Sequence, residues 1–133
     1  MMGNDPPVVA IINTSPDTIE MLRIVLEPEG FVVMGTYTYE LRDGEVDVEA
    51  LVKQHRPKLI IYDVAPPYDR NWRLFQHFSA MPALKGISFL ITTTNRRQVS
   101  EIAGPDREIF EIVGKPYDLG LIVQAVKDTI GRA

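Results

Sequence analysis

The chain has 133 residues, a net charge of −4, 45% hydrophobic and 24% charged residues, and no cysteine. These values are ordinary for one globular domain, and they exclude a disulfide scaffold and a thiolate metal site. The mild acidity, without any run of Lys or Arg, argues against a nucleic-acid-binding surface. Residues 1–7 lack the features of a secretion signal, and no stretch reaches about 18 apolar residues, so we expect a cytoplasmic protein without a membrane span.

The chain begins with a strand-like run and a well-marked helix. Residues 8–13 (VVAIIN) are β-branched and too few for a helix, so they predict a buried strand. The segment 15–17 (SPD) supplies an N-cap, a proline for the first helical position and an acid for the first turn. Pro28 and Gly30 end this helix, and residues 31–39 alternate loosely as a second strand would.

The middle of the chain repeats the alternation around one acidic residue. The polar residues 40–47 predict a loop, and residues 48–55 carry apolar side chains at helical spacing. Pro57 ends that helix, and residues 58–63 (KLIIYD) predict a third strand with Asp63 at its carboxyl end. A loop over residues 64–70 should follow.

The last part predicts two more strands. Helices are indicated by the apolar residues between 74 and 81, by the short segment 97–102, and by the apolar spacing from Leu119 to Ile130 after a cap at Asp118. Residues 87–93 and 109–113 are the fourth and fifth strands. Five alternating strands and helices predict a parallel sheet covered by helices, and ligands of such sheets gather at the carboxyl ends of the strands.

Chemically active residue types stand at four of these strand ends. They are Asn13-Thr14, Asp63, Thr92-Thr93 and Lys115-Pro116. A carboxylate can attack a phosphoryl group and form an acyl phosphate, a hydroxyl can bond a phosphate oxygen, and an ammonium offsets the phosphate charge. Because the carboxyl ends of parallel strands meet at one edge of the sheet, we expect an aspartate, a hydroxyl and a lysine to converge there.

This set resembles the receiver domains of two-component response regulators. Thr93 follows Asp63 by 30 positions and Lys115 follows it by 52, without gaps, and Pro67 matches the proline four residues after the phosphorylated aspartate. The resemblance covers essentially all of residues 1–133 as a single domain. It implies an α/β, flavodoxin-like, doubly wound five-stranded parallel sheet with strand order 2-1-3-4-5.

The resemblance also assigns roles. It implies that Asp63 is the phospho-acceptor, Thr93 the switch hydroxyl and Lys115 the charge partner of the phosphate, with a cis Lys115-Pro116 peptide. It implies a non-enzymatic signalling module whose partner is a sensor histidine kinase or another signalling protein. A face built from residues 97–130 would support a homodimer.

Three features depart from the receiver pattern. Asn13 and Thr14 replace the two acidic residues that help to hold Mg²⁺, so Asp63 with Asn13 would form at best a weak metal site. Ile112 replaces the aromatic residue three positions before the lysine, and the loop after Asp63 is bulkier than usual. Two versions of the function follow: Asp63 is phosphorylated with weak metal help, or the chain is a phosphorylation-independent pseudo-receiver in which Lys115 pairs permanently with Asp63.

A flavodoxin-like domain that binds a small cofactor or a nucleotide is the alternative from another class. Hydroxyls at residues 14–18 and the segment 92–97 could contact phosphate at helix N-termini. However, neither glycine-rich phosphate motif occurs, and a plain N-cap accounts for the hydroxyls. A hydrolytic enzyme is disfavoured because His55 and His77 both lie on predicted helices rather than at strand ends.

Overall fold

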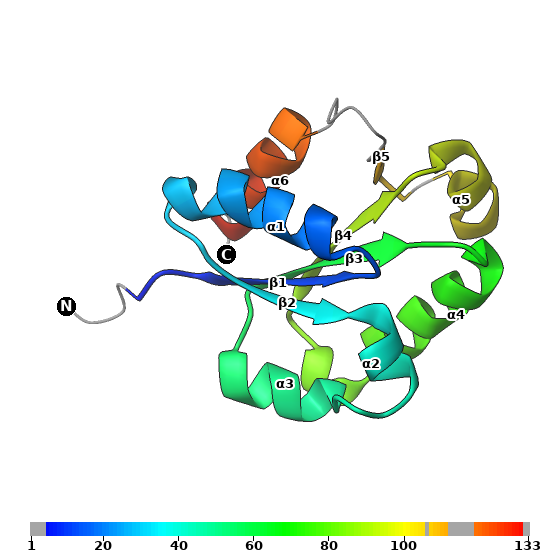
Figure 1. Ribbon diagram of the computed structural model, residues 1–133, viewed down its shortest axis with the longest axis horizontal. Helices are drawn as coiled ribbons and strands as arrows, with labels where there is room; N and C mark the ends of the chain where they lie inside the picture. The colour runs from blue at the N-terminus through cyan, green and yellow to red at the C-terminus, as the bar shows by residue number, and fades with distance from the viewer. Residues whose placement is uncertain (1–4, 106, 112–118, 132–133) are drawn as a thin grey trace.

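The computed structural model describes residues 5–105, 107–111 and 119–131. Within them lies a five-stranded parallel sheet of order β2-β1-β3-β4-β5, flanked by helices on both faces (Figure 1). The strands are β1 Val8–Asn13, β2 Val32–Tyr37, β3 Leu59–Val64, β4 Ser88–Thr93 and β5 Ile109–Glu111. The helices are α1 Pro16–Leu26, α2 Thr38–Arg42, α3 Val48–His55, α4 Tyr68–Ser79, α5 Arg96–Ala103 and α6 Leu119–Gly131, with short 3₁₀ turns η1 Glu27–Glu29 and η2 Pro82–Leu84. The predicted fold class and strand order are confirmed.

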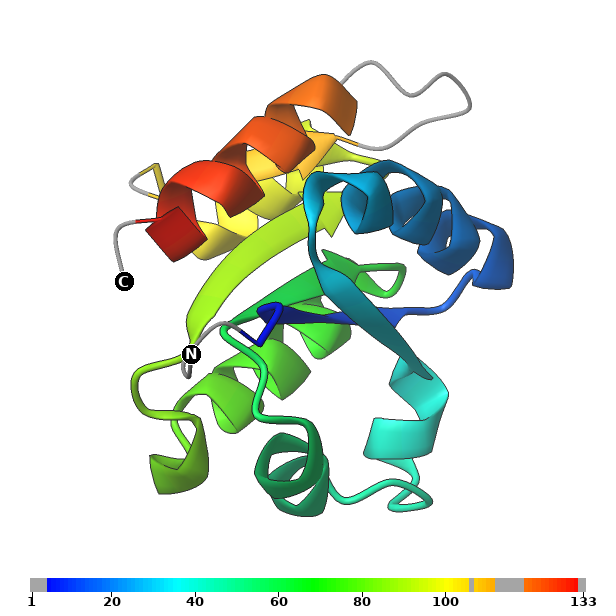
Figure 2. The same ribbon diagram turned by 90° about the vertical axis from the view of Figure 1, so that its left-hand side faces the viewer.

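The two faces of the sheet bury separate cores. Viewed along the sheet, α1 and α6 lie on one side and α3 and α4 on the other (Figure 2). Alternate residues of each strand enter the two layers, so Ile11 and Ile61 pack under α1 and α6, whereas Ile60 and Tyr62 pack against α4. Because β1 and β3 are central and covered on both faces, nearly every residue in them is apolar.

Local signals set the ends of the helices. The Ser15 hydroxyl accepts the N–H of Thr18 at 3.2 Å, and Pro16 occupies the first turn of α1, as predicted. The Asp47 carboxylate caps α3 by accepting the N–H of Glu49 at 3.0 Å. Helix α3 ends at His55; its C-cap is Arg56, whose φ of 48° lies in the left-handed region, and Pro57 follows.

The predicted loop over residues 40–47 is wrong in its first part. Residues 38–42 form the helix α2, because the side chain of Glu40 reaches back to accept the N–H of Tyr37 at 3.0 Å and Leu41 is buried. The second strand consequently ends at Tyr37 rather than at residue 39.

The predicted loop after Asp63 is also too long. Helix α4 begins at Tyr68, directly after a cis Pro66-Pro67 bond, and only three residues separate it from β3. In the part of the chain that the structure describes, no helix combines the length and the apolar character that crossing a bilayer requires.

Candidate functional site

Three polar side chains form a row at the carboxyl edge of the sheet. Asp63 pairs with Thr92 across β3 and β4, and Asn13 follows the Ile12–Tyr62 pair across β1 and β3. Paired residues of parallel strands face the same side of the sheet. Asn13, Asp63 and Thr92 therefore lie side by side, on the face that α1 and α6 cover.

The Asp63 carboxylate is largely removed from water. Its residue is 7% exposed, and the Thr92 hydroxyl donates to its Oδ1 at 2.7 Å. Burial raises the pKa of Asp63 from 3.8 to about 6, and the hydrogen bond from Thr92 offsets part of that rise by favouring the charged form. At neutral pH the carboxyl group is mostly ionised, and among the described side chains the Thr92 hydroxyl donates a hydrogen bond to it.

Thr93 lies on the opposite face of the sheet. Its hydroxyl donates to the Val64 carbonyl at 2.8 Å and accepts the N–H of Asn95 at 3.2 Å. The structure therefore brings Asp63 together with Thr92 and not with Thr93. The role of Thr93 as a switch hydroxyl stays a prediction, and acting on Asp63 would require both of these backbone contacts to break.

Lys115 and Pro116 lie outside the described residues, as does Ile112. The predicted convergence of Lys115 with Asp63 and the predicted cis bond before Pro116 are therefore expectations from the sequence. The described half of the site consists of Asp63, Thr92 and Asn13.

The side chain of Asn13 is already engaged. It is 2% exposed, and its Oδ1 accepts the N–H of Ser15 at 2.9 Å, which closes the turn into α1. Thr14 is exposed beside it. The side-chain oxygen of Asn13 thus shapes the backbone between β1 and α1.

A resident Mg²⁺ fits this donor set poorly. Mg²⁺ prefers carboxylates and near-octahedral oxygen geometry, and this row offers one carboxylate beside an amide oxygen that accepts another bond. Nor do the described residues contain any cluster of three His, Asp or Glu side chains that could hold a metal ion. The described residues thus offer no further carboxylate beside Asn13 and Thr14, where the resemblance leads us to expect an acidic pair.

Asn71 was not singled out from the sequence, although it holds the loop that follows Asp63. It is buried in α4, its Nδ2 donates to the Ala65 carbonyl, and its own backbone carbonyl accepts the Tyr62 hydroxyl at 2.9 Å. An asparagine within an otherwise aromatic helix face was the only available signal. These bonds fix the chain on both sides of Asp63.

The candidate phosphate cradles of the alternative function are helix caps. The Ser15 hydroxyl is bonded to Thr18 at the start of α1, and the Asn95 Oδ1 accepts the N–H of Gln98 at the start of α5. Both polar atoms are therefore engaged within their own helices, which is the plain N-cap interpretation.

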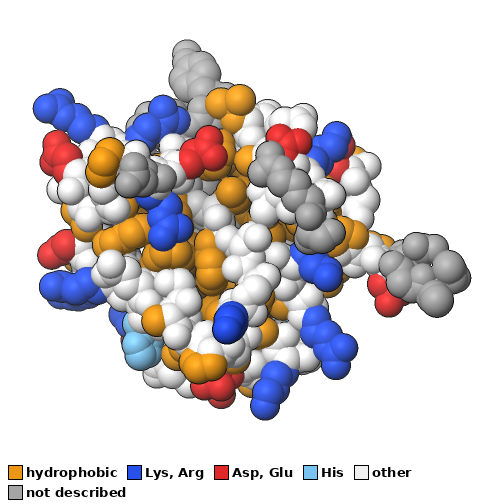
Figure 3. All heavy atoms as spheres, turned by 180° about the vertical axis from the view of Figure 1, so that it is seen from behind, with side chains coloured by type: hydrophobic (Ala, Val, Ile, Leu, Met, Phe, Trp, Pro, Cys, Tyr) orange, Lys and Arg blue, Asp and Glu red, His pale blue; other side chains and the backbone are white. Residues whose placement is uncertain are grey.

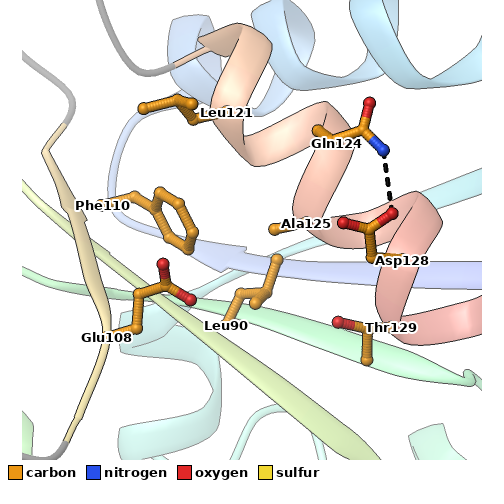
Figure 4. Close-up of a pocket in the computed structure, with 8 residues that line it drawn as sticks. All are labelled: Leu90, Glu108, Phe110, Leu121, Gln124, Ala125, Asp128 and Thr129. Carbon is orange, nitrogen blue, oxygen red and sulfur yellow. Dashed lines mark hydrogen bonds between the residues drawn. The ribbon is translucent and has the colours of Figure 1, made fainter.

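A separate hollow of about 260 Å³ lies between β5 and α6 (Figure 4). Phe110, Leu90 and Leu121 line it together with the carboxylates of Glu108 and Asp128, and Gln124 bonds Asp128 at 2.8 Å. Leu121, one of these lining residues, is 60% exposed.

No protein-family model matches the chain. It is 24% identical over 110 residues, which are 83% of this chain and 79% of the relative, to an uncharacterized 14.6 kDa protein in the sodA1 3′ region of Leptolyngbya boryana. That similarity carries no functional assignment.

Solved structures are more informative. A response regulator receiver protein from Burkholderia phymatum superposes with a TM-score of 0.65 at 20% identity, covering 94% of this chain and 95% of that one. A response regulator receiver modulated diguanylate cyclase from Pelobacter carbinolicus gives 0.67 at 15% identity, covering 95% and 93%. A transiently phosphorylated switch in bacterial signal transduction gives 0.66 at 16% identity, covering 96% of each chain. The chain therefore has the fold of the response regulator receiver domains.

Proposed function

We propose that this chain is a receiver-like signalling domain that acts through contacts with partner proteins, independently of metal-assisted phosphorylation of Asp63. The proposal rests on the position of Asn13 and on the hydrogen bond that its side chain accepts. Asn13 stands where the resemblance places a metal-binding acid, and it uses its side-chain oxygen for the turn into α1.

The chemistry supports a phosphorylation-independent role. An acyl phosphate forms only if the charge on the phosphoryl oxygens is offset while the carboxylate attacks. Receiver domains rely on Mg²⁺ for part of this, and the described row of Asn13, Asp63 and Thr92 offers it one carboxylate, which already accepts the Thr92 hydroxyl. The Asp63 carboxylate is moreover buried and bonded to Thr92, so a phosphoryl donor has little access to it.

The later helices are the proposed contact surface. Ile102 on α5 and Leu121 on α6 are exposed large hydrophobic residues, and the hollow between β5 and α6 lies beside Leu121 (Figure 4). A sensor kinase, another signalling protein or a second copy of the chain would cover this surface, and burying it supplies the binding free energy.

Phosphorylation is tested by incubating the protein with acetyl phosphate and Mg²⁺ and measuring its intact mass. We expect no phosphoryl adduct on the wild type, and no heat of Mg²⁺ binding by calorimetry with or without beryllofluoride. An adduct that forms on the wild type and is lost in Asp63→Asn would overturn the phosphorylation-independent function.

The contact surface is tested with two variants of matched exposure. Leu121 on α6 and Ile24 on α1 are 60% and 62% exposed, so Leu121→Asp and Ile24→Asp remove similar exposed apolar groups. If a homodimer forms through α5, β5 and α6, Leu121→Asp will lower the self-association constant in sedimentation equilibrium and Ile24→Asp will not. Equal effects of the two variants would argue against this surface.

A further inference from the structure

A basic hollow lies at the edge of the sheet opposite to Asp63, where the strands begin. Lys58 precedes β3, its N–H bonds the Val8 carbonyl at 2.9 Å, and its carbonyl accepts the N–H of Ser88 at 3.3 Å. The side chains of Arg56, Lys58 and Lys85 line a hollow of about 420 Å³ here. We call this site the basic hollow.

The cations of the basic hollow have no intramolecular partner among the described residues. Arg56, Lys58 and Lys85 are exposed, and none forms an ion pair with a described carboxylate, in contrast to Arg23, which contacts Glu20 and Glu27. Figure 3 shows Lys and Arg side chains gathered at the lower right of the face seen from behind, towards the amino ends of the strands. These three cations without an ion pair lie around one hollow, although the chain as a whole has a net charge of −4.

Arg56 is held in a backbone conformation that does not suit it. Its φ of 48° makes it the only non-glycine residue with positive φ in the described chain. Glycine or asparagine is the usual choice at such a helix C-terminus, because a Cβ is strained there. An arginine at this position therefore costs stability relative to glycine.

The basic hollow also has apolar lining residues. They are Val52, Ala83 and Ile87, from α3, η2 and the turn before β4. An adjoining hollow of about 300 Å³ shares Arg56 and Lys58, and there Asp5 supplies the one carboxylate found in the described lining of either hollow. The site thus combines three cationic side chains with apolar ones.

We propose that the basic hollow binds an acidic segment of a partner protein, one that carries an aliphatic side chain between its carboxylates. Carboxylates pair with Arg56, Lys58 and Lys85, and the aliphatic group contacts Val52, Ala83 and Ile87. An acidic protein segment suits this site better than a nucleic acid does. The lining has no aromatic ring on which a base could stack.

The site is independent of the proposed contact surface and of Asp63. The basic hollow lies where the strands begin, whereas Asp63 stands at the end of β3, with the whole strand between them. An acidic partner could therefore bind at the same time as a second protein at α5, β5 and α6.

The test uses the full chain and a fluorescein-labelled peptide of alternating glutamate pairs and single leucines. Fluorescence anisotropy should show saturable binding that weakens severalfold between about 50 mM and about 300 mM NaCl, since exposed charges are screened. The double variant Arg56→Gly/Lys85→Gln should weaken binding at least about fivefold. Its thermal stability should be unchanged or higher, since glycine relieves the backbone at residue 56.

Matched controls distinguish binding at the basic hollow from non-specific attraction between the peptide and any exposed cation. Arg73→Gln/Arg97→Gln removes two cations from exposed positions on α4 and α5 and should leave peptide binding within about twofold of the wild type. A peptide of glutamine and leucine should not bind. The inference is overturned if the glutamate peptide does not bind, if both double variants lose binding equally, or if single-stranded DNA or phosphatidylserine vesicles bind more tightly than the peptide.

Discussion

Thr92 and Asp63 face one another across β3 and β4, and the Thr92 hydroxyl donates a 2.7 Å hydrogen bond to the Asp63 carboxylate inside the protein. This contact stabilises the charged form of a carboxylate whose burial favours the neutral form. The balance between the two effects makes Asp63 a pH-dependent element of folding stability.

We expect Asp63 to destabilise the folded chain increasingly as the pH rises from about 4 to about 6. The folded protein holds the Asp63 proton to a higher pH than the unfolded chain does, since the pKa is raised from 3.8 to about 6. The stability from this proton is complete below pH 3.8 and is lost as the pH rises through about 6. The whole effect amounts to about 3 kcal/mol.

Urea unfolding of the wild type and of Asp63→Asn at several pH values measures this effect. The difference in unfolding free energy between them should grow in favour of Asp63→Asn by about 2 kcal/mol between about pH 4 and pH 7. Asp5→Asn, at an exposed position, should stay within about 0.5 kcal/mol of the wild type throughout. A difference that does not change with pH would contradict the raised pKa and would favour the permanent pair with Lys115.

Thr92 and Thr93 should have distinguishable effects on Asp63. Thr92→Val removes the hydrogen bond that lowers the pKa of Asp63, so that pKa should rise further, and the protein should lose about 1–3 kcal/mol of stability at neutral pH. Thr93→Val removes a bond to the Val64 carbonyl and should leave the titration of Asp63 unchanged. Carboxyl ¹³C chemical shifts of Asp63 against pH report both outcomes, and a response to Thr93→Val alone would show that Thr93 is the partner in solution.

Which of the adjacent threonines, Thr92 or Thr93, contacts Asp63 could not be predicted from the sequence. An offset of 30 residues identifies Thr93, but the side chains of a strand alternate between faces, so one position decides which hydroxyl reaches Asp63. The pairing of Asp63 with Thr92 settles this, and no sequence pattern contains that register. The carboxylate itself was identified correctly as a strand-end residue, because the run from Leu59 to Tyr62 is so uniformly apolar.

The fold was more predictable than the site for a similar reason. The strand β1 has the predicted bounds, residues 8–13, since it is a continuous β-branched run between turn residues. Helix α2 was missed because its five residues are too few for a periodic pattern, and its stability comes from the Glu40 cap and the burial of Leu41.

Restoring the acidic pair should restore metal binding. The double variant Asn13→Asp/Thr14→Asp places up to three carboxylates at the carboxyl edge of the sheet, and the new carboxylate at position 13 can still accept the N–H of Ser15. Repulsion among the carboxylates should destabilise the variant without metal, and Mg²⁺ should raise its thermal unfolding midpoint, while the wild type shows little change.

The same variant tests whether the missing acids are what prevents phosphorylation. With Mg²⁺ and acetyl phosphate it should gain a phosphoryl adduct, and adding Asp63→Asn should abolish it. If the variant binds Mg²⁺ and stays unlabelled, the burial of Asp63 or the undescribed residues around Lys115 must limit the reaction instead.

The close packing of α1 on β2 depends on Gly35. A Cβ added there would lie 2.6 Å from Cγ2 of Ile19, a buried branch of α1 that cannot rotate away freely. Gly35→Ala should therefore lower the unfolding free energy by about 1–3 kcal/mol through overpacking. Gly120→Ala in α6, with no atom within 4 Å of the added Cβ, should be neutral or stabilising by up to about 1 kcal/mol.

A double-mutant cycle tests whether the lost unfolding free energy of Gly35→Ala arises from its contact with Ile19. Ile19→Ala removes the Cγ2 branch, so Gly35→Ala should cost less in the Ile19→Ala background than in the wild type, with a coupling free energy of about 1 kcal/mol or more by urea denaturation. Additive effects would mean that the loss arises from the backbone of β2 at its pair with Ile11 instead.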